Sequence, residues 1–154
     1  MKRLWITAIA IFLVDRLTKL VVVEWLDLRS LADIEVVPPF LNFVMAWNRG
    51  VNFGIGASGS DLMRWGLIAL AVVICTGVIW WFRRAEGWLV PVSAGMLVGG
   101  AIGNVWDRVQ YGAVADFLNM SCCGIDNPYS FNVADVAIFV GALGLIFFTG
   151  KDAE

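Results

Sequence analysis

The chain has 154 residues, of which 60% are hydrophobic and 16% are charged, with a mean hydropathy of +0.79 and a formal net charge of -2. A soluble domain is ~45–50% apolar and ~25% charged, so this composition excludes an ordinary soluble domain and indicates a single membrane-embedded domain over residues 1–154. Histidine is absent, which excludes a Ser-His-Asp triad, a Cys-His pair and an HExxH zinc site, and without a basic run we expect no nucleic-acid partner.

The first apolar segment covers about residues 4–26 and is interrupted by Asp15, Arg16 and Lys19. Two basic residues precede it, as in a signal peptide, but no small-x-small cleavage site follows. We therefore predict an uncleaved first transmembrane helix. Asp15 and Lys19 are four residues apart and face each other on that helix, which suits a structural ion pair and a functional pair equally well.

The first long connection covers about residues 27–61. The stretches 34–37 and 40–47, on either side of a Pro-Pro turn, predict two short strands. The glycine-rich stretch 52–56 is predicted to bend back. Strands at this place would satisfy backbone polar groups close to lipid.

Three further apolar segments are each close to the ~20 residues that a ~30 Å hydrocarbon core requires. They cover about residues 62–82, 88–109 and 132–148. With the first segment, they predict an all-α polytopic membrane protein with four transmembrane helices. Gly95, Gly99 and Gly103 lie four residues apart on one face of the third segment, which favours close packing against another helix.

A second outer connection covers about residues 110–131, in which the stretch 113–118 predicts a third strand and so a small extracytoplasmic β-sheet. Basic residues near the ends of the segments set the topology. Those that fall on one side of a four-helix arrangement are Lys2, Arg3, Arg83, Arg84 and Lys151. Both termini are therefore predicted to be cytoplasmic, and the two long connections to face outward.

Polar residues gather where the third and fourth segments meet the outer side. Asn104, Asp107 and Arg108 stand at i, i+3 and i+4 and share a helix face. Asp116 follows in the outer connection, and Asp135 lies one turn into the fourth segment, at a similar depth. Ionisable groups at membrane depth cost ~2.5–3.5 kcal/mol each, so their convergence predicts a water-accessible cavity.

Each of these residues also has a simpler interpretation. Asn132 and Asp135 have the spacing of a helix capping box, and Asp116 could satisfy a turn. If Asp116 and Asp135 share a cavity, the pair holds a single proton, because two adjacent carboxylates do not both ionise cheaply. Such a pair could hydrolyse a peptide or relay protons, and the residues alone leave both open.

The chain resembles the lipoprotein signal peptidases, the signal peptidase II family. The stretches that carry the resemblance are Asp15-Arg16-Leu17-Thr18-Lys19, Asn48-Arg49-Gly50-Val51-Asn52-Phe53-Gly54, residues 99–108, Gly112-Ala113-Val114-Ala115-Asp116-Phe117 and Phe131-Asn132-Val133-Ala134-Asp135. They occur in the family's order, and the four-helix layout covers essentially the whole chain. Phe53-Gly54 stands where many relatives have Phe-Ser, and Cys122-Cys123 has no counterpart that we recognise.

The resemblance implies an aspartic endopeptidase that cleaves diacylglyceryl-modified prolipoproteins just before the lipidated cysteine. It implies Asp116 and Asp135 as the catalytic pair, without assigning which is base and which is acid. Asn104, Arg108 and Asn132 would bind substrate backbone and orient the pair.

The resemblance further implies that Asn48 and Gly50 lie in an outer loop beside the substrate, and that Asp15, Lys19 and Asp107 are structural supports. It places the protein in the bacterial cytoplasmic (inner) membrane, as a multi-pass protein with its active site at the outer leaflet. Membrane lipid and an inhibitory cyclic peptide of the globomycin type are the other implied partners.

No metal and no cofactor are expected. Cys75 lies in an apolar segment, and Cys122 and Cys123 lack the second pair that a zinc site needs. A small proton- or ion-coupled transporter is the main alternative, but it would favour internal repeats and acids at the midplane. A membrane scaffold would need no paired carboxylates, and a Ser-Lys protease lacks a serine near Lys19.

Overall fold

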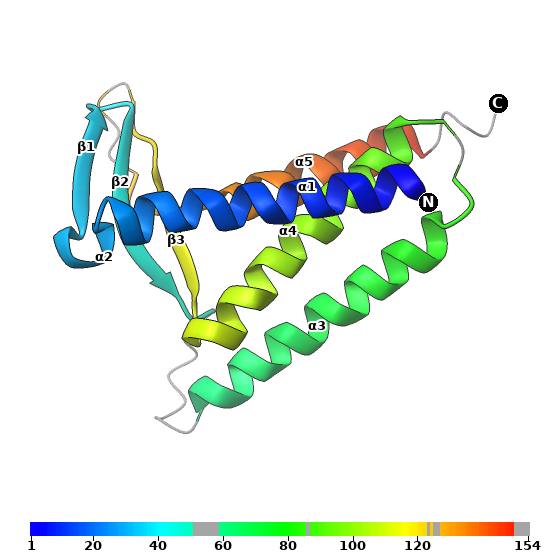
Figure 1. The fold of residues 1–154 in the computed structure, drawn as a ribbon, viewed down its shortest axis with the longest axis horizontal. Helices are drawn as coiled ribbons and strands as arrows, with labels where there is room; N and C mark the ends of the chain where they lie inside the picture. Colours follow the sequence, from blue (N-terminus) through cyan, green and yellow to red (C-terminus); the bar gives the residue numbers. More distant parts are fainter. Residues whose placement is uncertain (51–58, 86, 123, 125–126, 150–154) are drawn as a thin grey trace.

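Helices occur at each of the four predicted positions, with a small sheet at one end of the molecule (Figure 1). The computed structural model describes residues 1–50, 59–85, 87–122, 124 and 127–149. The predicted bend at residues 52–56, the basic residue Lys151 and Cys123 lie outside the described residues.

The helix boundaries agree with the apolar segments to within a few residues. Helix α1 (Lys2–Lys19) continues into a π-helical turn, η1 (Leu20–Trp25), and a short helix α2 (Leu28–Leu31) follows. The other long helices are α3 (Gly59–Phe82), α4 (Leu89–Tyr111) and α5 (Val133–Phe148). The ends of α1 and α5 that are remote from the sheet lie at the same end of the molecule, as the predicted topology requires.

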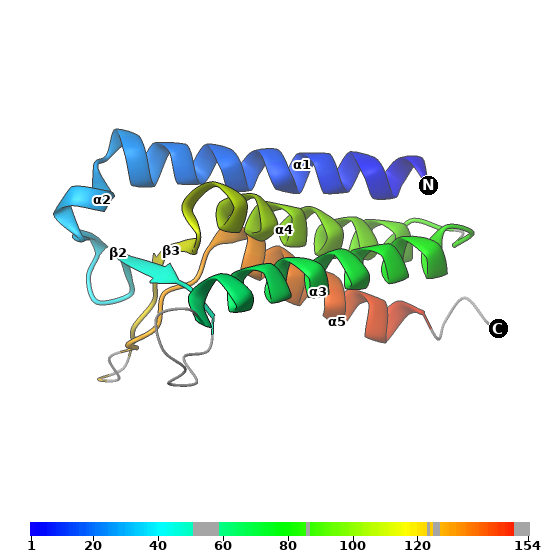
Figure 2. The same cartoon turned by 90° about the horizontal axis from the view of Figure 1, so that it is seen from below.

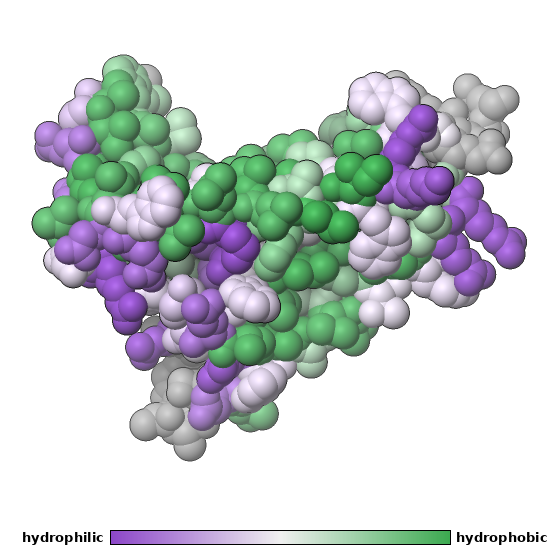
Figure 3. All heavy atoms as spheres, in the orientation of Figure 1, coloured by the Kyte–Doolittle hydropathy of each residue, from purple (hydrophilic) through white to green (hydrophobic). Residues whose placement is uncertain are grey.

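Among the described residues, two helical stretches are long and apolar enough to cross a membrane, Asp61–Phe82 and Leu89–Tyr111. Helix α5 is apolar over its 16 residues. Helix α1 is apolar in its middle and charged at both ends. Figure 3 shows hydrophobic residues covering the helices between hydrophilic residues at the two ends. Side chains such as Leu62, Val73 and Ile146 are 68–79% exposed, which suits a surface surrounded by lipid.

The sheet has three antiparallel strands in the order β1-β2-β3. Its strands are β1 (Asp33–Val37), β2 (Leu41–Asn48) and β3 (Val114–Asn119), which confirms the three predicted strands. One face of the sheet packs on the end of the first helix. Val22 and Val23 there form a buried apolar cluster with Leu28, Ala115 and Phe117. Strand β3 is therefore held between β2 and the helical bundle, and its register pairs Ala46 with Asp116.

Helix α4 lies between α1 and α5 and packs against both (Figure 2). The glycine face predicted from the sequence is its contact with α1. A Cβ atom on Gly95 would lie 2.5 Å from the Leu4 carbonyl oxygen, and one on Gly99 would lie 2.5 Å from the Ala8 carbonyl oxygen. Only glycine, whose side chain is a single hydrogen atom, allows the two backbones to approach this closely. Gly103 meets Asp15, so the same face ends at the charged residues.

The close contact between α1 and α4 can be tested with a glycine pair. Gly99→Ala should destabilise the fold by about 1–3 kcal/mol, because the added methyl group overlaps the Ala8 backbone. Gly77→Ala on α3 is the matched control, since a Cβ there meets nothing within 4 Å and helix propensity favours alanine by about 0.5–1 kcal/mol. Thermal unfolding in detergent measures both, and equal melting temperatures for the two variants would contradict the assigned packing.

Candidate active site

Asp116 on β3 and Asp135 in the first turn of α5 enter one hydrogen-bond network. Asp116 is 3% exposed, and its Oδ1 accepts a hydrogen bond of 2.6 Å from Nδ2 of Asn132. Oδ1 of Asp135 accepts one of 2.8 Å from Nδ2 of Asn104. The two amides are joined, because Nδ2 of Asn132 also lies 3.3 Å from Oδ1 of Asn104. Two carboxyl groups from different elements are thus connected through two side-chain amides.

Asn132 is the N-cap of α5 and forms the capping box expected from its spacing. The side-chain Oδ1 of Asn132 accepts a hydrogen bond of 2.9 Å from the backbone N–H of Asp135. The backbone N–H of Asn132 in turn donates to Oδ2 of Asp135 at 3.3 Å. The cap uses only the oxygen of the side-chain amide, so the fully buried NH2 group remains available for Asp116. The capping interpretation and the paired-acid interpretation therefore hold together in one residue.

Asn48 also reaches Asp116. It is the last residue of β2, two positions beyond Ala46, which pairs with Asp116 in the sheet, so both side chains belong to one face. Its side chain forms a hydrogen bond with the Asp116 carboxylate. Its Oδ1 accepts a hydrogen bond of 2.9 Å from the backbone N–H of Gly50. Gly50 has φ of 93°, a conformation that favours glycine, and a Cβ there would contact Leu67 and Met63 of α3.

Arg108 lies at the same end of α4 and has unused hydrogen-bonding capacity. Its Nη1 donates weakly to the Asn104 carbonyl oxygen at 3.4 Å. Its Nε is buried and has no hydrogen-bond partner among the described residues. The charge of Arg108 acts on both Asp135 and Asp116. A cation with a free, buried donor beside two acids can bind an oxygen atom that enters the site.

Burial, and after it the negative charge of Asp135, raise the pKa of Asp116 from its ordinary 3.8 to about 6. The hydrogen bonds from Asn48 and Asn132 and the charge of Lys19 oppose this shift. One carboxyl group of the pair can therefore hold a proton not far below neutral pH. A protonated acid beside an ionised one can act as general acid and general base. Within the described ranges, no group of three or more His, Cys, Asp or Glu residues could hold a metal ion.

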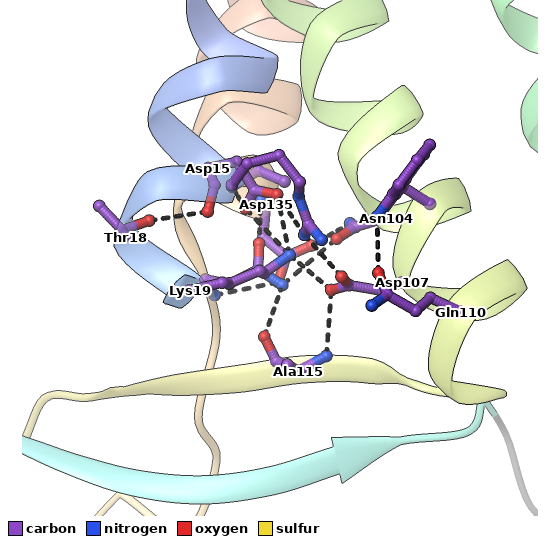
Figure 4. A network of polar contacts seen from close by, with 12 residues as sticks. Asp15, Thr18, Lys19, Asn104, Asp107, Gln110, Ala115 and Asp135 are labelled. Carbon is purple, nitrogen blue, oxygen red and sulfur yellow. Dashed lines mark hydrogen bonds and ion pairs between the residues drawn. The ribbon is translucent and has the colours of Figure 1, made fainter. Parts of the chain in front are cut away.

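A charged cluster lies close to Asp135 (Figure 4). The predicted ion pair of Asp15 and Lys19 is present, with Nζ and Oδ1 2.9 Å apart. Asp107, which shares a helix with Asn104 and Arg108, contacts this cluster instead of the pair, and its Oδ2 lies 2.6 Å from Nζ of Lys19. The fourth member is Arg16, whose Nη2 contacts Oδ2 of Asp15 at 2.9 Å. It also contacts Oδ1 of Asp107, at 2.5 Å.

Arg16 is not among the site residues expected from the sequence. Neighbouring positions on a helix point about 100° apart, so helical spacing does not pair Arg16 with Asp15. The long guanidinium side chain spans that angle. The one available signal was a cation next to an acid inside an apolar segment.

The chain is similar to known proteins along most of its length. A family model described as signal peptidase (SPase) II matches residues 7–150. The lipoprotein signal peptidase of Methylobacterium sp. (strain 4-46) is 41% identical over 140 residues, which cover 91% of this chain and 84% of that protein. The lipoprotein signal peptidase of Alteromonas mediterranea is 36% identical over 153 residues, covering 98% of this chain and 81% of that protein. A solved structure titled as a bacterial membrane enzyme at 1.9 Å resolution superposes with a TM-score of 0.80 and 26% identity, covering 99% of this chain and 95% of that one.

The raised pKa of Asp116 predicts a pH-dependent cost to folding. The folded state holds the Asp116 proton up to about pH 6, whereas an unfolded carboxyl group releases it near 3.8. Stability therefore falls as the pH rises through this window, by up to about 3 kcal/mol above pH 6. Asp116→Asn should raise the melting temperature at pH 7.5 and lose this advantage near pH 4. Asp61→Asn, at an exposed carboxylate, is the control. A melting temperature for Asp116→Asn that equals wild type at pH 7.5 would contradict the assignment.

Proposed function

Because the chain belongs to the signal peptidase II family, and so is a membrane peptidase that removes signal peptides from prolipoproteins, we propose that Asp116 and Asp135 carry out the cleavage. The main support is the buried amide of Asn132, which donates to Asp116 and caps the helix turn that carries Asp135. This link holds the two acids at one place although they come from a strand and a helix. The transporter considered from the sequence is set aside, because the matching family consists of peptidases.

The proposed mechanism uses one proton shared by the two acids. The ionised carboxylate removes a proton from a water molecule, and the resulting oxygen attacks the carbonyl carbon of the scissile bond. The protonated carboxyl group donates to the carbonyl oxygen and stabilises the tetrahedral intermediate. When the intermediate collapses, the carbon–nitrogen bond breaks and the leaving amine takes up a proton from the pair. The acids act as a unit, so the roles of base and acid belong to the pair.

Neighbouring polar groups are proposed to bind the substrate backbone. Arg108 has a buried Nε without a hydrogen-bond partner among the described residues, and its charge acts on both acids, whereas the amides of Asn104 and Asn132 hydrogen-bond to Asp135 and Asp116. They suit carbonyl oxygens of an extended peptide. Asn48 and Gly50 would border the substrate on the outer side, where Asn48 already contacts Asp116.

We further propose that all four long helices cross the bacterial inner membrane, with both termini cytoplasmic and the sheet at the outer leaflet. The helix ends with basic side chains lie opposite the sheet, and Arg83 there stacks on Trp80, as is usual at a membrane interface. The site then lies at the outer boundary of the lipid. A prolipoprotein held by its signal helix and diacylglyceryl chains would present the bond before its lipidated cysteine at that depth.

The same placement makes membrane lipid a proposed partner, and a globomycin-type cyclic peptide a proposed inhibitor that would occupy the substrate position. Confinement of the substrate to the membrane plane raises its concentration at the site without additional contacts.

Cleavage of a diacylglyceryl-modified prolipoprotein tests the catalytic assignment. Asp116→Asn and Asp135→Asn should each lower the rate at least about 100-fold, because each removes a group that must exchange a proton. Asp61→Asn serves as the control and should retain wild-type activity, since its carboxylate is exposed on α3. A chelator should leave the rate unchanged. Full activity in either Asp116→Asn or Asp135→Asn, or loss of activity on chelation, would refute the mechanism.

Thiol labelling in cells tests the proposed topology. In a variant without the three native cysteines, Glu35→Cys on β1 should react with a membrane-impermeant reagent added from outside. Arg84→Cys, at the opposite end of the molecule, should react only after the membrane is permeabilised. Both positions are exposed, so accessibility within the fold does not differ between them. The reverse labelling pattern would exclude the orientation.

A further inference from the structure

The charged cluster of Asp15, Arg16, Lys19 and Asp107 is bonded to the backbone next to each acid of the pair. Oδ2 of Asp107 accepts a hydrogen bond of 3.2 Å from the backbone N–H of Ala115, the residue before Asp116. Oδ1 of Asp15 accepts one of 3.3 Å from the backbone N–H of Ala134, the residue before Asp135. Each acid of the cluster thus holds the residue that precedes one acid of the proposed catalytic pair.

The two cations tie these two acids to each other. Nη2 of Arg16 contacts Asp15 and Asp107, at 2.9 and 2.5 Å. Nζ of Lys19 contacts the same two residues, at 2.9 and 2.6 Å. With two positive and two negative charges the cluster is neutral, and each cation bridges both acids. The distance between the Asp15 and Asp107 carboxylates is therefore restrained by both cations. Figure 4 shows Lys19 between Asp15 and Asp107.

Burial makes this restraint stiff. Asp15 and Asp107 are fully buried and Lys19 is 5% exposed, so their ion pairs lie in a medium of low dielectric constant, whereas the Arg16 side chain is 19% exposed. Buried ion pairs often contribute little net stability, and apolar residues of similar size can replace them without loss. Apolar side chains could fill this space, but they could not accept the hydrogen bonds that the backbone N–H groups of Ala115 and Ala134 donate. The particular contribution of the charges is thus to backbone position.

We propose that Asp15, Arg16, Lys19 and Asp107 are positioning residues that set the separation of Asp116 from Asp135 by holding the backbone one residue before each. This inference rests on the proposed function, since it concerns the geometry of the catalytic pair. The Asn132 bridge fixes the pair from the side-chain direction, and the cluster fixes it from the backbone. A displacement of about 1 Å between reacting groups can cost about 100-fold in rate, so loss of either tie should slow the chemical step.

Charge-balanced double variants test the proposal without leaving a buried unpaired charge. Asp107→Ala with Lys19→Met keeps the neutral pair of Asp15 and Arg16, and Asp15→Ala with Arg16→Met keeps the pair of Asp107 and Lys19. Each should lower kcat for prolipoprotein cleavage by about 100-fold and change KM by less than about threefold, because positioning acts on chemistry. Asp107→Asn, which keeps an acceptor for the Ala115 N–H, should lose less. Asp61→Asn is the control.

Amide hydrogen exchange separates positioning from general destabilisation. The amide of Ala115 should exchange faster in the Asp107 double variant while that of Ala134 stays protected, and the reverse should hold in the Asp15 double variant. Such crossed protection supports the proposal. Faster exchange of both amides in both variants, or wild-type kcat in either one, overturns it.

The experiment also distinguishes the two levels of inference. If the wild-type protein cleaves the prolipoprotein and Asp116→Asn does not, the proposed function stands whatever the double variants do. If those variants then keep wild-type kcat, only the positioning role fails. If the wild-type protein does not cleave the substrate while the crossed exchange is seen, the proposed function fails and the backbone tie is real.

Discussion

The structure of the site depends on how one buried amide is shared. The side chain of Asn132 caps α5 with its oxygen and binds Asp116 with its nitrogen, so the helix that carries Asp135 and the strand that carries Asp116 meet at a single residue. A capping amide normally leaves its NH2 group in water. In Asn132 that group is fully buried, and the pKa of Asp116, which accepts its hydrogen bond, is raised. The local rule for beginning a helix is thereby coupled to the chemistry proposed for the protein.

Close packing of the helix backbones surrounds the place where α5 and β3 meet. Helix α4 approaches α1 through a glycine face that ends at Gly103, where the next contact is Asp15. Because the backbones are close there, short side chains such as Asp15 and Asp107 can reach N–H groups on neighbouring elements. The charged cluster and the glycine packing are therefore two parts of one arrangement. Helix α3, by contrast, is largely exposed, and its Arg64 donates a hydrogen bond to the carbonyl oxygen of Val109 on α4.

A membrane location changes the energetic meaning of these groups. Buried acids in a soluble core reduce stability unless they are paired, and Asp116 carries such a cost in its raised pKa. In the proposed placement at the outer boundary of the lipid, the same burial would keep the proposed reaction site away from bulk water, and the substrate would arrive from the membrane plane. Stability lost at the acids is a recurrent feature of sites that must retain a reactive proton.

Much of this protein could be read from the sequence alone, because the length of an apolar segment, the spacing of glycines and the alternation of strand residues are local properties. They predicted the helices, a close contact of the Gly99 face with another helix and the three strands, and the motifs selected Asp116 and Asp135. Helical spacing grouped Asp107 with Asp116 and Asp135 and did not indicate a role for Arg16. In the structure, Arg16 and Asp107 are hydrogen-bonded to each other, although they lie 91 positions apart in the chain. Only the packing of α1 on α4 decided that partnership, since the reach of a long side chain and the position of a distant backbone N–H are set by tertiary structure and leave no periodic trace in the sequence.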